Sequence, residues 1–519
     1  MVYRKTWMLF LSVVVWLQKC VTLKTHTPPH IVFIVADDLG WNDVSWHNSD
    51  LLTPNLERLA RNGIILDSSY ALPSCTPSRN SYMTGMYPFH TRPDPIEPPE
   101  PYYIPLKFPL LPERLKQLGY STHMVGKWHL GFCNEKYTPT RRGFDSFFGF
   151  YIGSQCHYYH DKAGYVQNED SINLSLKSPH HVLVQSLLAA RRRYYVTGKD
   201  FRFNDTIWRE TEGTYSTIAF ANRAVDIIKR HDPEVPLFLY LPFQAPHTPV
   251  TVPYQYSQLY KNIASPVRRV YSGMVSAIDE AVGNITRALY EKGFMDNLLL
   301  VFTSDNGGQP EMGGNNWPLR GAKSSVWEGG TRVPTFVYSE SLLQRRRYVS
   351  NELLHSVDWF PTFLEAAGGR PERGIDGKSQ WSMLTKGQPS GRNEFVYQIS
   401  SDGKGALRMG DHKLLVGKPG HHNGWYAPPS KTKISKWHYK GGKFDSVAYT
   451  NDEYQLYNIR EDPAERTNIA KDYPEITRKM LRRFQYHNST KVPAFKNMRA
   501  GDGHSDPGNY GGFWSPGWC

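Results

Sequence analysis

Three short apolar runs constrain the fold of this chain more than any other feature. They are rich in Ile, Val, Leu and Phe and occupy residues 31–35, 236–241 and 297–303. Such uninterrupted runs are typical of strands buried on both faces of a parallel sheet. Segments with helical spacing alternate with them, as at 54–62 and 217–230. This alternation predicts an α/β protein with a large, mainly parallel sheet flanked by helices.

Acidic and amide side chains directly follow two of these runs. Asp37 and Asp38 come after the first run, and Asp305 and Asn306 come after the third. The carboxyl ends of parallel strands share one edge of a sheet, which is where open α/β sheets carry their sites. As an isolated pair, Asp37 and Asp38 would also suit a turn and a helix cap. Together the four oxygen donors favour Ca²⁺, leave Mg²⁺ open, and do not suit zinc.

The segment 74–87 places a cysteine at a predicted helix start. Cys75 precedes Thr76 and Pro77, and proline is tolerated in the first turn of a helix. Backbone donors at this end, with Arg79 one turn further on, would bind an oxyanion. Taken alone, the same pattern also fits an ordinary buried cysteine beside a helix start.

Two segments resemble the signatures of the type I sulfatases. Residues 75–79, Cys-Thr-Pro-Ser-Arg, followed by Thr84-Gly85, resemble the first signature, and 119–129, ending in Gly-Lys-Trp-His, resemble the second. The resemblance is nearest to arylsulfatase B-like members and extends over almost the whole mature chain. It implies an alkaline-phosphatase-like large sheet with a smaller C-terminal α+β domain. It also implies that the formylglycine-generating enzyme oxidises Cys75 to formylglycine (3-oxoalanine).

The resemblance implies a role for each matching side chain. Arg79 would fix the formylglycine and bind sulfate, and Lys127 and Lys323 would bind sulfate oxygens. His129 would hydrogen-bond the hydrated aldehyde and remove its second proton when sulfate leaves. His247, which lies between prolines after the second apolar run, would contact the sulfate and assist the leaving oxygen.

The implied activity is hydrolysis of aryl or sugar sulfate esters through a covalent sulfate intermediate. Calcium would bind the sulfate, and residue 75 would join the four oxygen donors as a metal ligand. Two rival functions stay open. One is a phosphodiesterase or phosphonate hydrolase of the same superfamily, which can share the nucleophile. The other is an inactive, glycan-binding sulfatase-like protein.

The N-terminus predicts entry into the secretory pathway. Arg4 and Lys5 precede an apolar run at 7–17, which reads as a signal peptide at 1–22. We expect a catalytic domain at 28–375 and a smaller domain at 376–519, and a secreted or lysosomal protein of open oligomeric state. No later segment approaches the roughly 18 apolar residues of a membrane span. Four sequons predict N-glycosylation at Asn173, Asn204, Asn284 and Asn488.

Cysteine count and charge complete the sequence-based expectations. Of five cysteines, Cys20 leaves with the signal peptide and Cys75 is modified, and we expect Cys133 to pair with Cys156. The formal charge of +13 falls by three, to +10, when the signal peptide is removed. A basic surface favours anionic partners such as sulfated glycans. No nucleic-acid-binding motif accompanies this charge.

Expectations also follow for two further segments. Residues 161–215 are polar and irregular, and we expect a surface excursion that helps shape the substrate entrance. The tail from residue 501 is rich in glycine and carries Trp514 and Trp518. We expect it to pack by its aromatic side chains without regular structure.

Overall fold

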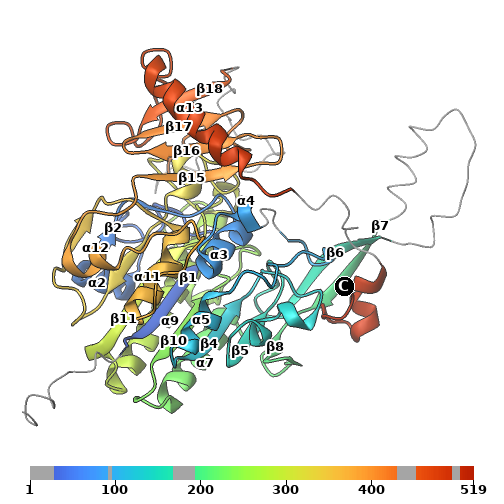
Figure 1. The fold of residues 1–519 in the computed structure, drawn as a ribbon. Helices are drawn as coiled ribbons and strands as arrows, with labels where there is room; N and C mark the ends of the chain where they lie inside the picture. Colours follow the sequence, from blue (N-terminus) through green and yellow to red (C-terminus); the bar gives the residue numbers. More distant parts are fainter. Residues whose placement is uncertain (1–27, 92–95, 168–192, 429–451, 494–502) are drawn as a thin grey trace, which may run out of the picture.

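A ten-stranded sheet forms the centre of the larger body of the protein (Figure 1). The computed structural model describes residues 28–91, 96–167, 193–428, 452–493 and 503–519. In spatial order, the strands are β13 (Tyr348–Ser350), β2 (Ile64–Leu66), β12 (Phe336–Tyr338), β11 (Leu298–Ser304), β1 (His30–Ala36), β10 (Leu237–Pro242), β4 (Ser121–Lys127), β5 (Ser146–Phe150), β8 (Arg202–Phe203) and β9 (Thr206–Ile207).

The middle of this sheet is parallel and its edges are mixed. β11, β1, β10, β4 and β5 run parallel as adjacent strands, whereas β12 and β8 pair in antiparallel fashion at the two sides. The three apolar runs of the sequence are β1, β10 and β11, and all their residues are buried. The predicted fold class is therefore confirmed.

Helices cover both faces of the sheet. Their bounds are α2 (Pro54–Asn62), α3 (Cys75–Thr84), α4 (Pro88–Thr91), α5 (Leu111–Gln117), α7 (Ser216–Arg230), α8 (Tyr254–Gln258), α9 (Pro266–Glu291), α10 (Glu328–Thr331), α11 (Trp359–Ala366), α12 (Trp381–Lys386) and α13 (Pro474–Ser489). Phe33 of β1 contacts Tyr82 of α3 and Trp359 of α11, so these helices cover one face. Phe148 of β5, on the opposite face, contacts Phe220 of α7, which packs on α9.

A second, antiparallel sheet forms the smaller C-terminal unit at the top of Figure 1. It consists of β15 (Glu394–Ile399), β16 (Gly405–Met409), β17 (His412–Val416) and β18 (Tyr454–Asn458). Helix α13 packs on it through the buried side chains of Met480 and Phe484. This agrees with the expected α+β unit, while the boundary between 375 and 376 stays a prediction.

The expectation of irregular structure over 161–215 is wrong in the part that the structure describes. β6 (Asp161–Gln167) and β7 (Arg193–Lys199) form an antiparallel pair, and β8 and β9 follow. The C-terminal tail lies against this pair: Trp514 N donates to Lys199 O at 2.9 Å, and Lys199 N donates to Gly512 O at 2.9 Å. The tail packs by its buried Trp514, as predicted. The expectation that it lacks regular structure is wrong, because it forms two short 3-10 helices, Gly503–Ser505 and Pro507–Tyr510.

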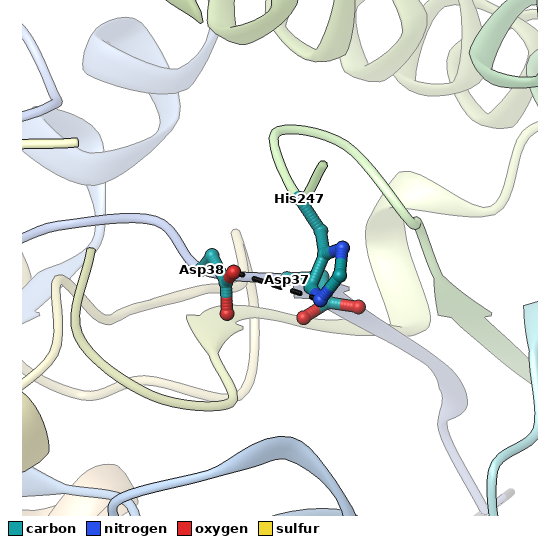
Figure 2. Close-up of side chains that lie close together, drawn as sticks. All are labelled: Asp37, Asp38 and His247. Carbon is teal, nitrogen blue, oxygen red and sulfur yellow. Dashed lines mark ion pairs between the residues drawn. The ribbon is translucent and has the colours of Figure 1, made fainter. Parts of the chain in front are cut away.

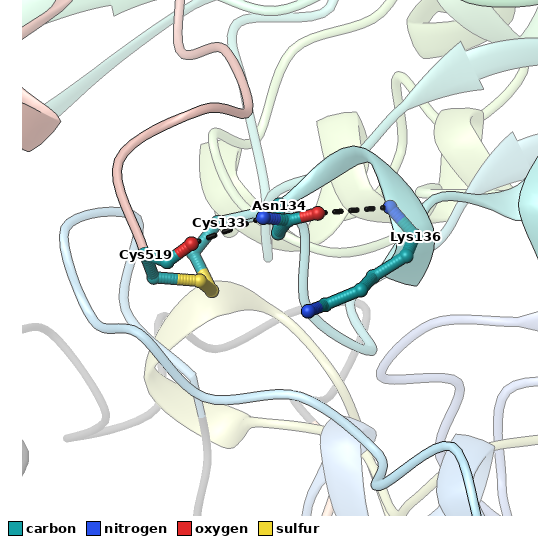
Figure 3. The surroundings of a disulfide bond; sticks show 4 residues. All are labelled: Cys133, Asn134, Lys136 and Cys519. Carbon is teal, nitrogen blue, oxygen red and sulfur yellow. Dashed lines mark hydrogen bonds between the residues drawn. A yellow bond between two sulfur atoms is a disulfide. The ribbon is translucent and has the colours of Figure 1, made fainter.

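The predicted disulfide between Cys133 and Cys156 is wrong. Cys133 is bonded to Cys519 across 386 residues of sequence (Figure 3). Cys156 is a free thiol. The tail brings Cys519 into place because Gly517 N and Trp518 N both donate to Cys133 O, at 2.9 and 3.0 Å. Nearness in sequence is therefore a poor guide to this pairing.

The structure tests only some of the expectations about membrane spans, the signal peptide and glycosylation. Among the described residues, no helix combines the length and the apolar character needed to cross a bilayer. The predicted signal peptide and Asn173 lie outside the described residues. Asn204 lies in a turn, Asn284 in α9 and Asn488 in α13, all half-buried, and their glycosylation stays a prediction.

Candidate active site

Four neighbouring parallel strands bring the candidate residues to one edge of the large sheet. Because β11, β1, β10 and β4 are adjacent and parallel, the loops at their carboxyl ends meet. These loops and strand ends carry Asp305 and Asn306 (β11), Asp37 and Asp38 (β1), His247 (β10), and Lys127 and His129 (β4). Helix α3 adds Cys75 and Arg79, and the loop before α10 adds Lys323.

Two carboxylates and two cations form the buried centre of the cluster. Arg79 Nη2 lies 2.7 Å from Asp305 Oδ2 and 3.4 Å from Asp37 Oδ2. Lys127 Nζ lies 2.5 Å from Asp37 Oδ2. Burial alone would raise the pKa of Asp37, but Lys127 and the other nearby cations hold it well below its usual range. Burial and the charge of Asp37 raise the pKa of Asp305 to about 6.

Asp38, the residue after Asp37, contacts Lys323 and Asn306. Lys323 Nζ lies 2.7 Å from Asp38 Oδ1, and Asn306 Nδ2 donates to the same oxygen at 2.7 Å. Burial opposes ionisation of Lys323, but Asp38 outweighs it and raises the pKa of the ammonium group. Asp38 adopts the left-handed backbone region with φ of 64°, and Tyr271 Oη donates to its carbonyl at 2.8 Å. The turn is thus held so that both carboxylates face the cluster.

Cys75 lies at the first position of α3, buried within this cluster. Its Sγ and carboxylate oxygens of Asp37 and Asp305 all lie within 4.8 Å of one another. Burial raises the pKa of the Cys75 thiol, and the two carboxylates raise it further, against the effect of Lys127 and Lys323. An unmodified Cys75 would therefore stay protonated at neutral pH, which makes it a poor thiolate nucleophile.

His129 is a neutral imidazole whose hydrogen-bond partners define its tautomer. Its Nε2 lies 2.8 Å from Ile96 O, and a carbonyl can only accept, so Nε2 carries the hydrogen. Its Nδ1 lies 3.2 Å from Thr76 Oγ1 and is left as an acceptor. Burial and the charge of Lys127 hold the pKa of His129 well below its usual range. In this tautomer Nδ1 is the ring atom that carries no hydrogen and is the one that would accept a proton.

His247 lies opposite the two aspartates on the loop after β10 (Figure 2). Its Nδ1 donates to Thr248 O at 2.7 Å, and its Nε2 lies 3.7 Å from Asp38 Oδ2. Burial and the charge of Lys323 lower the pKa of His247 to about 4. The His157 ring contacts the His247 carbonyl at 3.2 Å, which fixes this loop to the segment that follows β5.

The donor set at the cluster suits a hard divalent cation. Asp37 Oδ1 and Asn306 Oδ1 are buried and have no hydrogen-bond partner among the described residues. Buried polar oxygens without partners are rare in proteins, and a bound cation would satisfy both of them. Asp38 and Asp305 add carboxylate oxygens beside them. These residues therefore fit a calcium ion by ligand type.

Two neighbours of the site were not predicted from the sequence. Thr76, next to Cys75, contacts the His129 ring, and its position in the signature was the available signal. Lys162 of β6 donates from Nζ to Ser154 Oγ at 2.9 Å, and burial, together with the charges of Lys127 and Lys323, lowers the pKa of its ammonium group. Lys162 lies in the segment 161–215, which was expected to be irregular, and no sequence motif there indicates a binding residue.

Comparison with known proteins gives consistent matches over most of the chain. The family model described as "Sulfatase" matches residues 29–369. Arylsulfatase J from Mus musculus is 38% identical, with 94% of this chain and 80% of that protein covered. N-acetylgalactosamine-6-sulfatase from Homo sapiens is 30% identical, covering 90% of this chain and 87% of that one. The crystal structure of Ps i-CgsB in complex with k-i-k-neocarrahexaose is 27% identical, with a TM-score of 0.72 over 91% of this chain and 95% of that one.

Proposed function

This chain belongs to the sulfatase family and is an arylsulfatase-type sulfatase that hydrolyses sulfate esters; we propose that it does so through a formylglycine formed from Cys75. The observation that supports this most is the placement of Cys75. Its sulfur lies with carboxylate oxygens of Asp37 and Asp305 within 4.8 Å, at the N-terminal end of a buried helix. As a thiol it has a raised pKa and little use as a nucleophile, whereas a hydrated aldehyde there would be well placed for sulfate transfer.

The modified residue supplies both halves of the reaction. One hydroxyl of the hydrated aldehyde attacks sulfur and displaces the alcohol by S–O cleavage, and deprotonation of the other then expels sulfate by C–O cleavage and restores the aldehyde. His129 is the proposed base for the second half, because its Nδ1 is an unprotonated acceptor in the neutral ring. His247 is proposed to contact the sulfate and assist the leaving oxygen through Nε2, the ring atom that faces Asp38 at 3.7 Å.

The cations of the cluster are proposed to bind the sulfate group. Arg79, Lys127 and Lys323 surround the position of residue 75 and would neutralise the charge that develops on the ester. A calcium ion held by the oxygens of Asp37, Asp38, Asp305 and Asn306 and by residue 75 would withdraw further charge from the sulfate oxygens. Such an ion would take up the charges of Asp37 and Asp38, which would leave the charges of Lys127 and Lys323 to be balanced by the sulfate.

Maturation and location follow from the same proposal. The formylglycine-generating enzyme would act on Cys75 during secretion, so we propose a secreted or lysosomal protein with the signal peptide removed. The disulfide between Cys133 and Cys519 is compatible with an oxidising compartment. We also propose a catalytic domain at 28–375 and a smaller domain at 376–519. Among substrates, the sulfatase relatives favour sulfate esters of sugars or of aryl alcohols.

A turnover comparison tests this function. Wild-type protein should hydrolyse an aryl sulfate faster than an aryl phosphate diester, and Cys75→Ala should abolish sulfatase activity while the protein stays folded by circular dichroism. Cys156→Ala is the matched control, because Cys156 is the other free thiol among the described residues and should be dispensable. Preferred turnover of the phosphate diester would identify a phosphodiesterase instead. Inactive secreted protein with an unconverted Cys75 would favour the glycan-binding alternative.

A further inference from the structure

Lys162 is a charged side chain near the active site that the proposed reaction does not use. It lies at the second position of β6 and is half-buried. Its Nζ donates to Ser154 Oγ at 2.9 Å, and among the described residues this hydroxyl is its only hydrogen-bond partner. No carboxylate of the described residues lies within ion-pair distance of it, although Glu97 acts on its charge from further away. Lys162 therefore carries a positive charge that the described chain does not neutralise by direct contact.

Two contacts connect the strand of Lys162 to the segments around His129. Ser154, its hydrogen-bond partner, follows Gly153, and a Cβ added to Gly153 would lie 2.7 Å from His129 Nε2. The His129 ring also donates a hydrogen bond to Ile96 O. The segment that carries Ile96 continues to Pro99, which lies against β6: a Cβ added to Gly164 of that strand would lie 3.5 Å from Pro99. The strand that carries Lys162 is thus packed against both segments that hold His129.

The electrostatic setting of Lys162 is unfavourable without an anion. Burial lowers the pKa of its ammonium group, and the charges of Lys127 and Lys323 lower it further, although Glu97 acts in the opposite direction. A partly buried cation whose charge is opposed by two other cations is stabilised when an anion binds near it. The sulfate ester undergoing hydrolysis already has three cationic partners in the proposed reaction. Lys162 is therefore available to a further negative charge on the same substrate.

The C-terminal tail holds Lys162 in position. Trp514 Nε1 donates to Lys162 O at 3.0 Å, and Trp514 N donates to Lys199 O on the paired strand at 2.9 Å. The tail is in turn fixed by the disulfide between Cys133 and Cys519. Figure 1 shows the C-terminus beside β6 and β7. A binding side chain on a strand fixed in this way loses little freedom when a ligand binds.

We propose that Lys162 is a substrate-binding residue for a second anionic group, a sulfate or a carboxylate, located next to the sulfate ester that is hydrolysed. The enzyme would then prefer polyanionic sulfated saccharides over substrates with one sulfate group. This inference rests on the proposed sulfatase site, and it names the class of substrate for that site. The formal charge of +13 of the chain also favours polyanionic ligands.

Direct binding tests this inference without requiring turnover. Calorimetry on the Cys75→Ala protein would compare N-acetylgalactosamine 6-sulfate with the 4,6-disulfate and with a uronate-containing disaccharide 6-sulfate. A charge-assisted contact predicts that at least one dianion binds about tenfold or more tightly than the monosulfate. Lys162→Met should remove this preference and Lys162→Arg should keep most of it. The dianion whose advantage depends on Lys162 identifies the second group as sulfate or carboxylate.

The outcomes separate this inference from the proposed function. Equal affinity for all three probes, or an equal loss on all three in Lys162→Met, would overturn the role of Lys162 in recognition. Ser154→Ala provides the structural control, since it removes the partner of Nζ but keeps the charge and should preserve the preference. If the preference holds while wild-type protein hydrolyses no sulfate ester, the proposed function fails and the polyanion site stands.

Discussion

Lys413→Met should destabilise the protein because Lys413 lies between two buried carboxylates. Its Nζ is 2.9 Å from Glu328 Oε1 and 2.8 Å from Glu465 Oε1, and all three side chains are inaccessible to solvent. Lys413 belongs to β17 of the four-stranded sheet, whereas Glu328 begins α10 beside the large sheet. The three charges therefore join the smaller unit to the larger one.

The expected loss follows from the burial of the cluster. Removing one partner of a buried ion pair costs about 3–5 kcal/mol, because the remaining charges are left unpaired. Unfolding entropy of roughly 2.1 cal/mol/K per residue gives about 1 kcal/mol/K for a chain of this length, so Tm should fall by about 3–5 °C. Scanning calorimetry of wild-type and variant protein at pH 8 measures this difference.

The loss should depend on pH in a defined direction. Burial and the neighbouring Glu328 raise the pKa of Glu465 to about 7, against the effect of Lys413. Without Lys413 this pKa rises further. A folded-state pKa above the unfolded value means that protonation stabilises the folded protein at low pH and that this stabilisation is lost as pH rises. The deficit of Lys413→Met should thus be largest at pH 8 and smaller at pH 5.

A second variant makes the comparison decisive. Lys413→Met combined with Glu465→Gln removes one carboxylate together with the cation, so it should recover much of the lost stability and show a weaker pH dependence. A deficit below about 1 kcal/mol for Lys413→Met would refute the assigned cost. An equal deficit at pH 5 and pH 8 would refute the electrostatic origin of that cost.

Three further predictions concern acid stability, the tail and the metal. Burial and His231 lower the pKa of His30 to about 4, so the stability that neutral His30 contributes is complete above pH 6.5 and is lost as pH falls. Between pH 7.5 and pH 5, the free energy of unfolding of His30→Gln should therefore fall by about 1–2 kcal/mol less than that of wild type, as measured by calorimetry. Cys519→Ser should lower stability by about 2–4 kcal/mol and speed proteolysis of the tail, and unchanged rates would contradict the anchoring role of the disulfide. Removal of the metal by a chelator should lower Tm, and added Ca²⁺ should restore it. In Asp38→Asn the fall in Tm on chelation should be smaller.

The centre of the fold was predictable because parallel strands bury both faces. The runs at 31–35, 236–241 and 297–303 had no alternating polar positions, and each became a central strand. Short edge strands lack that signal. Residues 64–70 form two such short strands, β2 and β3 (Ser69–Tyr70), and β3 pairs with β14 (Leu354–His355) in a separate sheet.

The site was predictable where its residues follow strand ends. Asp37 and Asp305 meet because β1 and β11 are adjacent and parallel, which the position of polar residues after apolar runs had indicated. The disulfide and Lys162 were not predictable, since both depend on how the C-terminal tail folds back over distant strands. Contacts of that kind arise from tertiary packing and leave no periodic pattern in the sequence.

Peptide mass spectrometry of residue 75 in active, secreted protein tests the mechanism most directly. The proposed reaction predicts an aldehyde at this position in the active fraction, with activity that rises in proportion to the converted share of molecules. A fully active preparation in which Cys75 is an unmodified thiol would contradict it.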